Sequence, residues 1–264
     1  MKFATITPIA GLEKYGTYLS NTHLVLAQLM YNRTYSDYYS IRRQAGDFII
    51  LDNGAYENTR PIDKDAYFNI IKNLNPQVAV LPDQLMSPWR ITTSLSLRFL
   101  DEFAERLANS HYTTQWMFVP QCERPADFLA SLHTVLDDGR AGHHVSWIGL
   151  GRYLATKFDN PPEGDFNWRT RFAKEVKHFF PQMKLHALGM AAGDVEELKE
   201  LKAAGVKSID SSCAVWRGWN GYGLEDPDWK TFGTPCNFHA EAATSSADIL
   251  IQENLEVIRA ALAG

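Results

Sequence analysis

Residues 48–84 have the sequence FIILDNGAYENTRPIDKDAYFNIIKNLNPQVAVLPDQ. It contains two short apolar runs, at 48–54 and 78–84, and each run ends in polar residues. Between them, 63–74 has the apolar spacing of an amphipathic helix. A strand, a helix and a second strand in this order predict a βαβ unit with parallel strands.

The same pattern extends along the whole chain. Further helical segments are expected at 88–109, 165–179, 193–204 and 246–262. Eight strand–helix units in 264 residues predict a (β/α)8 TIM barrel, and no linker, repeat or charge block divides residues 1–264 into more than one domain. The remaining six apolar runs are FATITP (3–8), THLVLAQ (22–28), WMFVPQ (116–121), VSWIGLG (145–151), KLHALG (184–189) and VKSIDSS (206–212).

The composition is that of an ordinary globular protein, with 45% hydrophobic and 22% charged residues. No apolar stretch approaches the roughly 20 residues of a membrane span. The first apolar run favours a strand over a signal peptide. Three scattered cysteines, Cys122, Cys213 and Cys236, do not make a disulfide framework, so we expect a reducing cytoplasm and no membrane partner.

The charge balance argues mildly against a general nucleic-acid binder, because the formal net charge is −5. Basic residues such as Arg152, Arg169 and Arg217 nevertheless lie near expected strand ends or in loops. The sequence leaves open whether they form a patch or are scattered solubilising charges.

Polar residues lie where the expected strands end, which is where barrel enzymes carry their active sites. The main candidates are Asp52, Asp83, Gln121, Gly149 and Asp210. Each has a structural alternative, and for Asp52 that alternative is capping of the following turn or helix. Several carboxylates at the same end of the barrel repel one another, and this electrostatic cost is best explained by a function. Together they therefore favour a functional site.

Seven motifs lie at these positions: LSNTHLVL (19–26), LDNGAYE (51–57), AVLPDQLMSP (79–88), FVPQ (118–121), WIGLG (147–151), LHALGM (185–190) and SIDSS (208–212). In this order they resemble the tRNA-guanine transglycosylase superfamily. The chain lacks the family's zinc module, since only Cys236 and His239 remain in the corresponding region, and two ligands do not make a structural zinc site. In this it is similar to the compact phage-type 7-deazaguanine transglycosylases that act on DNA, which would imply the host cytoplasm.

The resemblance implies a pentosyltransferase that replaces guanine in a polynucleotide with a 7-deazaguanine base, with DNA favoured over tRNA. Asp210 would be the nucleophile that forms a covalent sugar–enzyme intermediate, and Asp52 the general acid/base. Such a pair of carboxylates suits a displacement at C1′ with overall retention. No metal or other cofactor is implied, and the oligomeric state stays open.

The resemblance also implies a pocket for the base. Asp83 would accept the N1–H and amino edge of a guanine-type base, while Gln121 and the amide of Gly149 would donate to O6. Tyr56 would stack on the base with Leu188 on its other face, although both also fit ordinary barrel packing. The carbonyl of Leu150 would face a substituent at position 7.

An aromatic stretch, WRGWNGYGLEDPDWKTFGTP (216–235), follows the last expected strand. We expect an ordered loop that covers the barrel mouth and places Trp219 and Arg217 against the polymer. Packing of these aromatics on the barrel is equally compatible with the sequence.

Two readings from other classes remain. Barrels with acidic strand ends also occur as metal-dependent hydrolases, but His23, His186 and His239 have no ligand spacing with the acids. A catalytically silent guanine-binding protein would keep Asp83 and Gln121 without needing Asp52 and Asp210 together.

Overall fold

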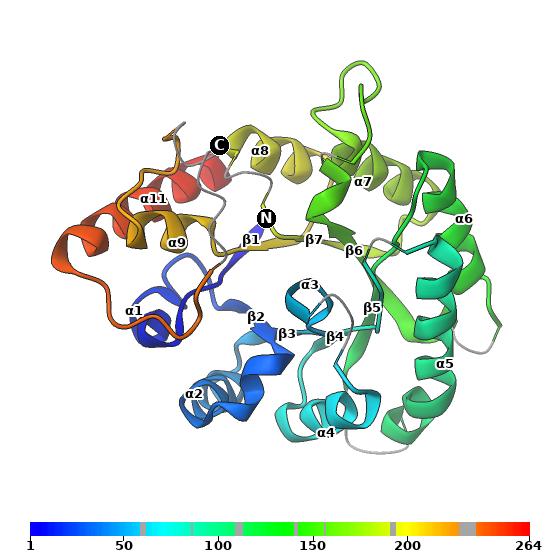
Figure 1. The fold of residues 1–264 in the computed structure, drawn as a ribbon. Helices are drawn as coiled ribbons and strands as arrows, with labels where there is room; N and C mark the ends of the chain where they lie inside the picture. Colours follow the sequence, from blue (N-terminus) through cyan, green and yellow to red (C-terminus); the bar gives the residue numbers. More distant parts are fainter. Residues whose placement is uncertain are drawn as a thin grey trace. The chain divides into compact units, whose positions relative to one another are not determined.

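The computed structural model describes residues 1–58, 62–85, 87–108, 113–139, 142–155, 157–190, 194–226 and 236–264 (Figure 1). Its eight strands form one sheet in the order β1-β8-β7-β6-β5-β4-β3-β2 and alternate with helices along the chain. This is the topology of a (β/α)8 barrel, so the predicted fold class is confirmed. The strands are β1 (Lys2–Thr5), β2 (Thr22–Leu26), β3 (Phe48–Asp52), β4 (Val78–Val80), β5 (Gln115–Phe118), β6 (Val145–Gly151), β7 (Lys184–Leu188) and β8 (Ser208–Ser211).

The helices follow the predicted segments closely. Short 3-10 helices are η1 (Ile9–Gly11), η2 (Ala27–Tyr31), η3 (Gly142–His144) and η4 (Arg152–Ala155). The α-helices are α1 (Leu12–Tyr15), α2 (Arg33–Gln44), α3 (Ala55–Asn58), α4 (Lys64–Leu74), α5 (Trp89–Ala108), α6 (Pro125–Leu136), α7 (Trp168–Phe179), α8 (Val195–Ala203), α9 (Cys213–Trp219) and α11 (Ser245–Ala263).

Most strands are shorter than the apolar runs, because those runs continue past the strand into the polar residues that follow it, whereas β6 has the bounds of its run, 145–151. Strand pairing is parallel where β1 meets β8 and along β3, β4, β5 and β6. In these registers Ala4 faces Asp210, and Val80 faces Met117. The pairing thereby determines how far along the sheet the polar residues at the end of each strand lie.

The chain divides into two compact units. Unit 1 contains Met1–His23, Arg152–Glu175 and Ala187–Gly264, and unit 2 contains Leu24–Gly151 and Val176–His186. The expectation of a single domain over 1–264 stays a prediction.

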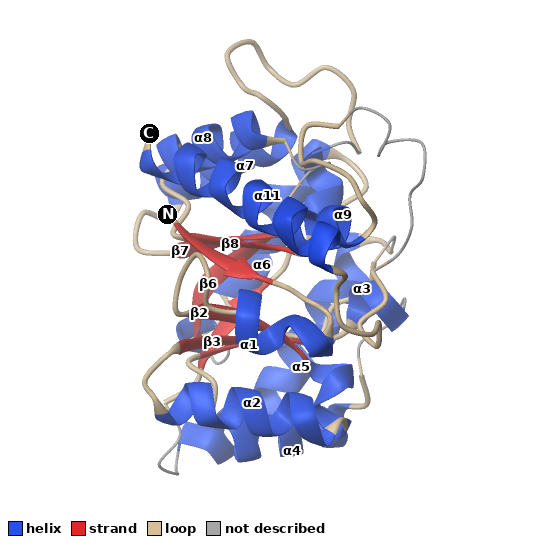
Figure 2. Cartoon of the chain, turned by 90° about the vertical axis from the view of Figure 1, so that its left-hand side faces the viewer, coloured by secondary structure: helices blue, strands red, loops and turns tan. Residues whose placement is uncertain are grey.

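Unit 2 has an aromatic core outside its strands. Phe103, on α5, lies with its ring centroid 4.6 Å from that of Phe68 on α4 and 4.8 Å from that of Phe99. Helices α2 and α4 lie side by side in both views (Figure 2). Burial of this apolar surface is the main force that holds helices to the sheet.

Unit 1 is closed by the contact of α9 with α11. The side chain of Asn254, on α11, donates to the carbonyls of Ala214 and Tyr222 and accepts from the amide of Leu224. A buried side chain thus connects α11 to both α9 and the turn that follows it.

The predicted aromatic loop at 216–235 is wrong in its first part. Residues 216–219 belong to α9, where Trp216 and Arg217 are buried. The apolar residues of α9 pack on α11, so this segment was able to bury its aromatic surface as a helix. Residues 220–226 form turns, and 227–235, with Trp229, lie outside the described residues.

Among the helices that the structure describes, no one is both long and apolar enough to cross a membrane.

Candidate active site

The best-defined polar group in unit 2 surrounds Asp83, just beyond β4. We call Asn53, Asp83 and Gln121 the Asp83 cluster, and all three are buried. The Asn53 side-chain amide donates to Asp83 Oδ1 at 2.7 Å, and the Gln121 side-chain amide donates to Asp83 Oδ2. Both carboxylate oxygens therefore accept an amide donor.

Asn53 is fixed from three directions. Its Nδ2 also donates to the carbonyl of Leu81 at 2.7 Å, and its Oδ1 accepts the amide of Ala55 at 2.8 Å. It therefore connects the end of β3 to the end of β4 and to the start of α3. In the sequence Asn53 stands out only as a member of the motif LDNGAYE, and this role was not predicted.

Burial shapes the electrostatics of the cluster. Loss of solvent raises the pKa of Asp83 to about 6, although the hydrogen bonds from Asn53 and Gln121 favour the charged form. Burial also raises the pKa of Tyr67, and the charges of Asp52 and Asp83 add to that shift. The Tyr67 hydroxyl donates to the carbonyls of Leu51 and Val80, so it fixes β3 against β4 beneath the cluster.

Asp52 ends β3 and accepts the amide of Gly54 at 2.9 Å. Gly54 has φ 75°, a left-handed conformation that favours glycine. The carboxylate thus closes the Asp-Asn-Gly turn, which is the capping alternative noted for it, and it stays half-buried. Tyr56 follows on α3 and is 63% exposed, so its ring is accessible for stacking.

Gly149 and Leu150 lie in β6, next to β5 in the sheet. Both are buried, and the Leu150 side chain belongs to the core. Only their backbone groups are therefore suited to contact a ligand, as the predicted roles require.

The second polar group lies in unit 1 around Asp210, on β8. Asp210 is 4% exposed, and its Oδ2 accepts the amide of Gly189 at 3.1 Å. Gly189, directly after β7, has φ 70°. A Cβ at this position would also lie 3.3 Å from the Arg152 side chain. The left-handed φ therefore favours glycine at the residue that contacts Asp210, and a side chain there would also press against Arg152.

A buried ion pair lies behind Gly189. Arg169, from α7, and Glu197, from α8, are both fully buried and lie 2.7 Å apart. Arg169 Nη1 donates to the carbonyls of Leu188 and Gly189 at 3.1 and 2.7 Å. From the sequence, Arg169 was only one of several basic residues near strand ends or in loops, with a patch and scattered charges both left open.

The structure brings the predicted site residues together in two groups. Asp83 and Gln121 are in direct contact in unit 2, near the end of β3 that carries Asp52. In unit 1, Asp210 contacts the residue that follows Leu188. Asn53 and Arg169 are the contacts that the sequence analysis missed, since the partners of a buried polar side chain depend on the registers of strands far apart in the chain.

The two residues predicted to contact nucleic acid have different environments. Arg217 is buried, and its guanidinium donates to the carbonyl of Leu224, so it serves the fold of unit 1. Burial also lowers the pKa of Arg217. Trp219 is half-buried, and its ring lies 6.5 Å from that of Tyr15 in an edge-to-face contact.

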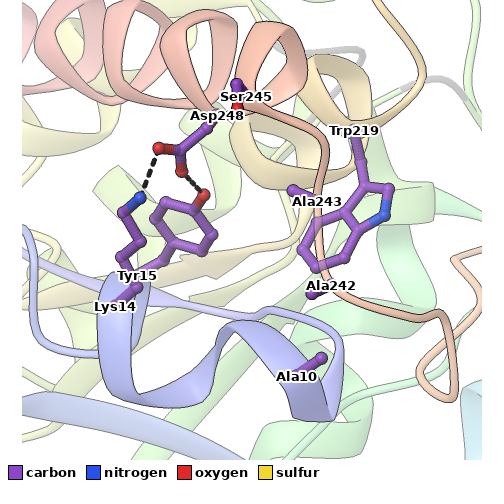
Figure 3. A pocket seen from close by; sticks show the side chains of 8 residues that line it. All are labelled: Ala10, Lys14, Tyr15, Trp219, Ala242, Ala243, Ser245 and Asp248. Atoms are coloured by element: carbon purple, nitrogen blue, oxygen red, sulfur yellow. Dashed lines mark hydrogen bonds and ion pairs between the residues drawn. The ribbon is translucent and has the colours of Figure 1, made fainter.

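Trp219 lines a pocket of about 280 Å³ on unit 1 (Figure 3). Lys14 and Tyr15 both point toward Asp248 on α11 and hydrogen-bond to it. Ala242 and Ala243 lie beside the indole and leave room next to it. The pocket therefore combines an aromatic surface with charged groups at its side.

Within the described parts of the chain, no group of three or more His, Cys, Asp or Glu side chains could hold a metal ion. His239 lies three residues after Cys236, and its backbone amide donates to the Asn237 side chain.

No protein-family model matches this chain, and no curated protein matches its sequence. The fold therefore supports only the general statement that barrels of this topology are commonly enzymes with sites at the strand ends.

Proposed function

We propose that this protein is a pentosyltransferase that exchanges guanine in a polynucleotide, DNA rather than tRNA, for a 7-deazaguanine base. The observation that carries the proposal is the Asp83 cluster, a buried carboxylate held by two amide side chains at a strand end. The resemblance of the strand-end motifs to the tRNA-guanine transglycosylase superfamily supplies the reaction.

The chemistry of the cluster suits a guanine-type base. A carboxylate accepts the paired N1–H and amino donors of guanine, and an amide N–H donates to O6. The Gln121 amide has a second N–H beside the one that it gives to Asp83, and this would serve O6. The backbone of Gly149 and Leu150 in β6 would face the remaining ring edge, and exposed Tyr56 would stack on the base.

The covalent step is assigned to Asp210. Its carboxylate would attack C1′ as the glycosidic bond to guanine breaks, and the departing base would take a proton from Asp52. The incoming base would give up its N9 proton to Asp52 and displace Asp210, which restores both carboxyl groups and gives retention. Leu188 would contact the second face of the base.

The test is incorporation of labelled guanine into single-stranded DNA, duplex DNA and tRNA. We expect incorporation by the natural protein and by a surface control, Asp137→Asn, but none by Asp210→Asn, which should still bind the free base. No incorporation into any polymer, together with metal-dependent hydrolysis, would overturn the proposal in favour of a hydrolase.

Binding of the free base tests Asp83 separately by calorimetry. Asp83→Asn should weaken guanine binding by about 100-fold, because one acceptor would face two donors after the change. Equal affinities of the variant and the natural protein would make Asp83 a purely structural residue.

A further inference from the structure

The most complete buried charge system in the described residues is Arg169 with its partners. Two nitrogens of Arg169 face the carboxylate of Glu197. Arg169 Nε donates to Oε1 at 3.0 Å, and Arg169 Nη2 lies 2.7 Å from Oε2. Glu197 Oε1 also accepts the side-chain amide of Asn167 at 3.0 Å. Two nitrogens of the guanidinium thus face the two oxygens of Glu197, Nε through a hydrogen bond and Nη2 through ion-pair contact alone.

The remaining nitrogen, Nη1, points at the turn after β7. It donates to the carbonyl of Leu188 at 3.1 Å and to that of Gly189 at 2.7 Å. The Leu188 carbonyl and the Gly189 amide belong to one peptide group, and that amide donates to Asp210 Oδ2 at 3.1 Å. A single peptide group thus connects the arginine to the carboxylate.

This geometry has a direct electrostatic consequence. A cation at the carbonyl end of a peptide group polarises it and strengthens the donor at its amide end, because hydrogen bonds in a chain reinforce one another at low dielectric. Burial of Arg169, Glu197 and Asp210 strengthens the effect, because charges and dipoles are less screened away from water. Burial lowers the pKa of Arg169, and the charges of Glu197 and, more weakly, Asp210 oppose that shift.

We infer that Arg169, held by Glu197, is a positioning residue that aims the 188–189 peptide at Asp210 and fixes the carboxylate for attack. This rests on the proposed role of Asp210 as nucleophile. Arg169 touches neither base nor sugar in this assignment, so it acts only through the peptide. The Gly189 conformation, with φ 70°, is part of the same device because it directs the amide toward β8.

The experiment compares a double variant, Arg169→Met with Glu197→Gln, with the natural protein. Changing both residues avoids leaving one buried charge without its partner, which would endanger folding. The matched control is Arg171→Met with Glu175→Gln, which removes a 2.8 Å ion pair elsewhere on α7. Thermal unfolding confirms that each protein is folded. Should the double variant not fold, Arg169→Lys replaces it, since lysine keeps the charge but has a single nitrogen in place of the Nε that bonds to Glu197 and the Nη1 that bonds to the 188–189 turn.

Two measurements are made on each protein. The first is exchange kinetics, in which we expect kcat to fall about 30-fold in the Arg169 double variant with KM nearly unchanged, since only the reacting carboxylate is displaced. The second is hydrogen exchange of the Gly189 amide by NMR, which we expect to be about tenfold faster in the same variant. The control should match the natural protein in both.

The two outcomes that matter are distinguishable. A folded Arg169 variant with unchanged kcat, or with unchanged Gly189 amide exchange, would overturn the positioning role while leaving the transglycosylase intact. If the natural protein exchanges no base at all, the proposed function fails, and the amide measurement still decides whether Arg169 controls the contact with Asp210.

Discussion

At the scale of single residues, the buried carboxylate of Asp83 is the clearest sign of a specialised environment. An ionised carboxyl loses its hydration on burial, and the two amide donors of the Asp83 cluster only partly replace it, which is why its pKa rises to about 6. A core position would be more stable with an apolar side chain. A carboxylate kept here is therefore better explained by recognition of a ligand with paired donors.

The raised pKa predicts how stability depends on pH. Folding favours the protonated form of Asp83, so its contribution is full below its ordinary pKa of 3.8 and is lost as the pH rises through about 6. A shift of this size corresponds to about 3 kcal/mol. Relative to Asp83→Asn, the natural protein should lose that amount between pH 4 and pH 7, measured by urea unfolding. Parallel pH curves for the two proteins would contradict the burial argument.

At the scale of elements, α9 shows what the sequence could and could not predict. The strand VKSID and the last helix were predicted from periodicity, because each buries a regular apolar face. The segment 216–219 has two tryptophans and a glycine in four residues, a composition that also suits a loop. Its packing against α11 favours the helix, and this contact between segments far apart in the chain cannot be predicted from the local sequence.

Gly218 lies where the backbones of α9 and α11 come close together. A Cβ there would lie 2.6 Å from the backbone nitrogen of Ile251, which cannot move without displacing α11. Gly218→Ala should therefore destabilise the protein by about 2 kcal/mol in urea unfolding, despite the better helix propensity of alanine. The control is Gly223→Ala, where a Cβ meets nothing within 4 Å. A stabilising effect at Gly218 would mean that α9 and α11 are less closely packed.

Trp219 is the aromatic of α9 that remains available to a partner. Its pocket with Ala242 and Ala243 could receive a base that flanks the target nucleotide. Trp219→Ala should weaken binding of single-stranded DNA about tenfold by fluorescence anisotropy, and Trp219→Phe should retain most of it. Arg217→Ala should instead reduce thermal stability, since its guanidinium bonds to the carbonyl of Leu224. Equal DNA affinity in Trp219→Ala would assign the ring to packing alone.

At the scale of the whole molecule, the alternation of apolar runs and helical segments predicted the barrel topology because both signals are local. The strand ends were predictable for the same reason, since the polar residue that follows a buried run lies at or close to the end of β3, β4, β5 and β8. The partners of Asp83 and Asp210 were not, because Asn53, Gln121 and Gly189 follow other strands. Predicting them requires the register of the sheet, which one sequence does not reveal.

The choice of polymer is a property of the whole chain. In duplex DNA the target base is stacked and paired, so exchange requires the nucleotide to flip out at a cost of a few kcal/mol. We therefore expect labelled guanine to enter single-stranded DNA faster than duplex DNA, and a duplex with a mismatched target guanine to lie between them. The measurement is label incorporated per strand at equal concentration, with a tRNA transcript as the competing substrate and Asp210→Asn as the blank. Incorporation into tRNA alone would reverse the polymer assignment and leave base exchange standing, because the Asp83 cluster would recognise the same base in either polymer.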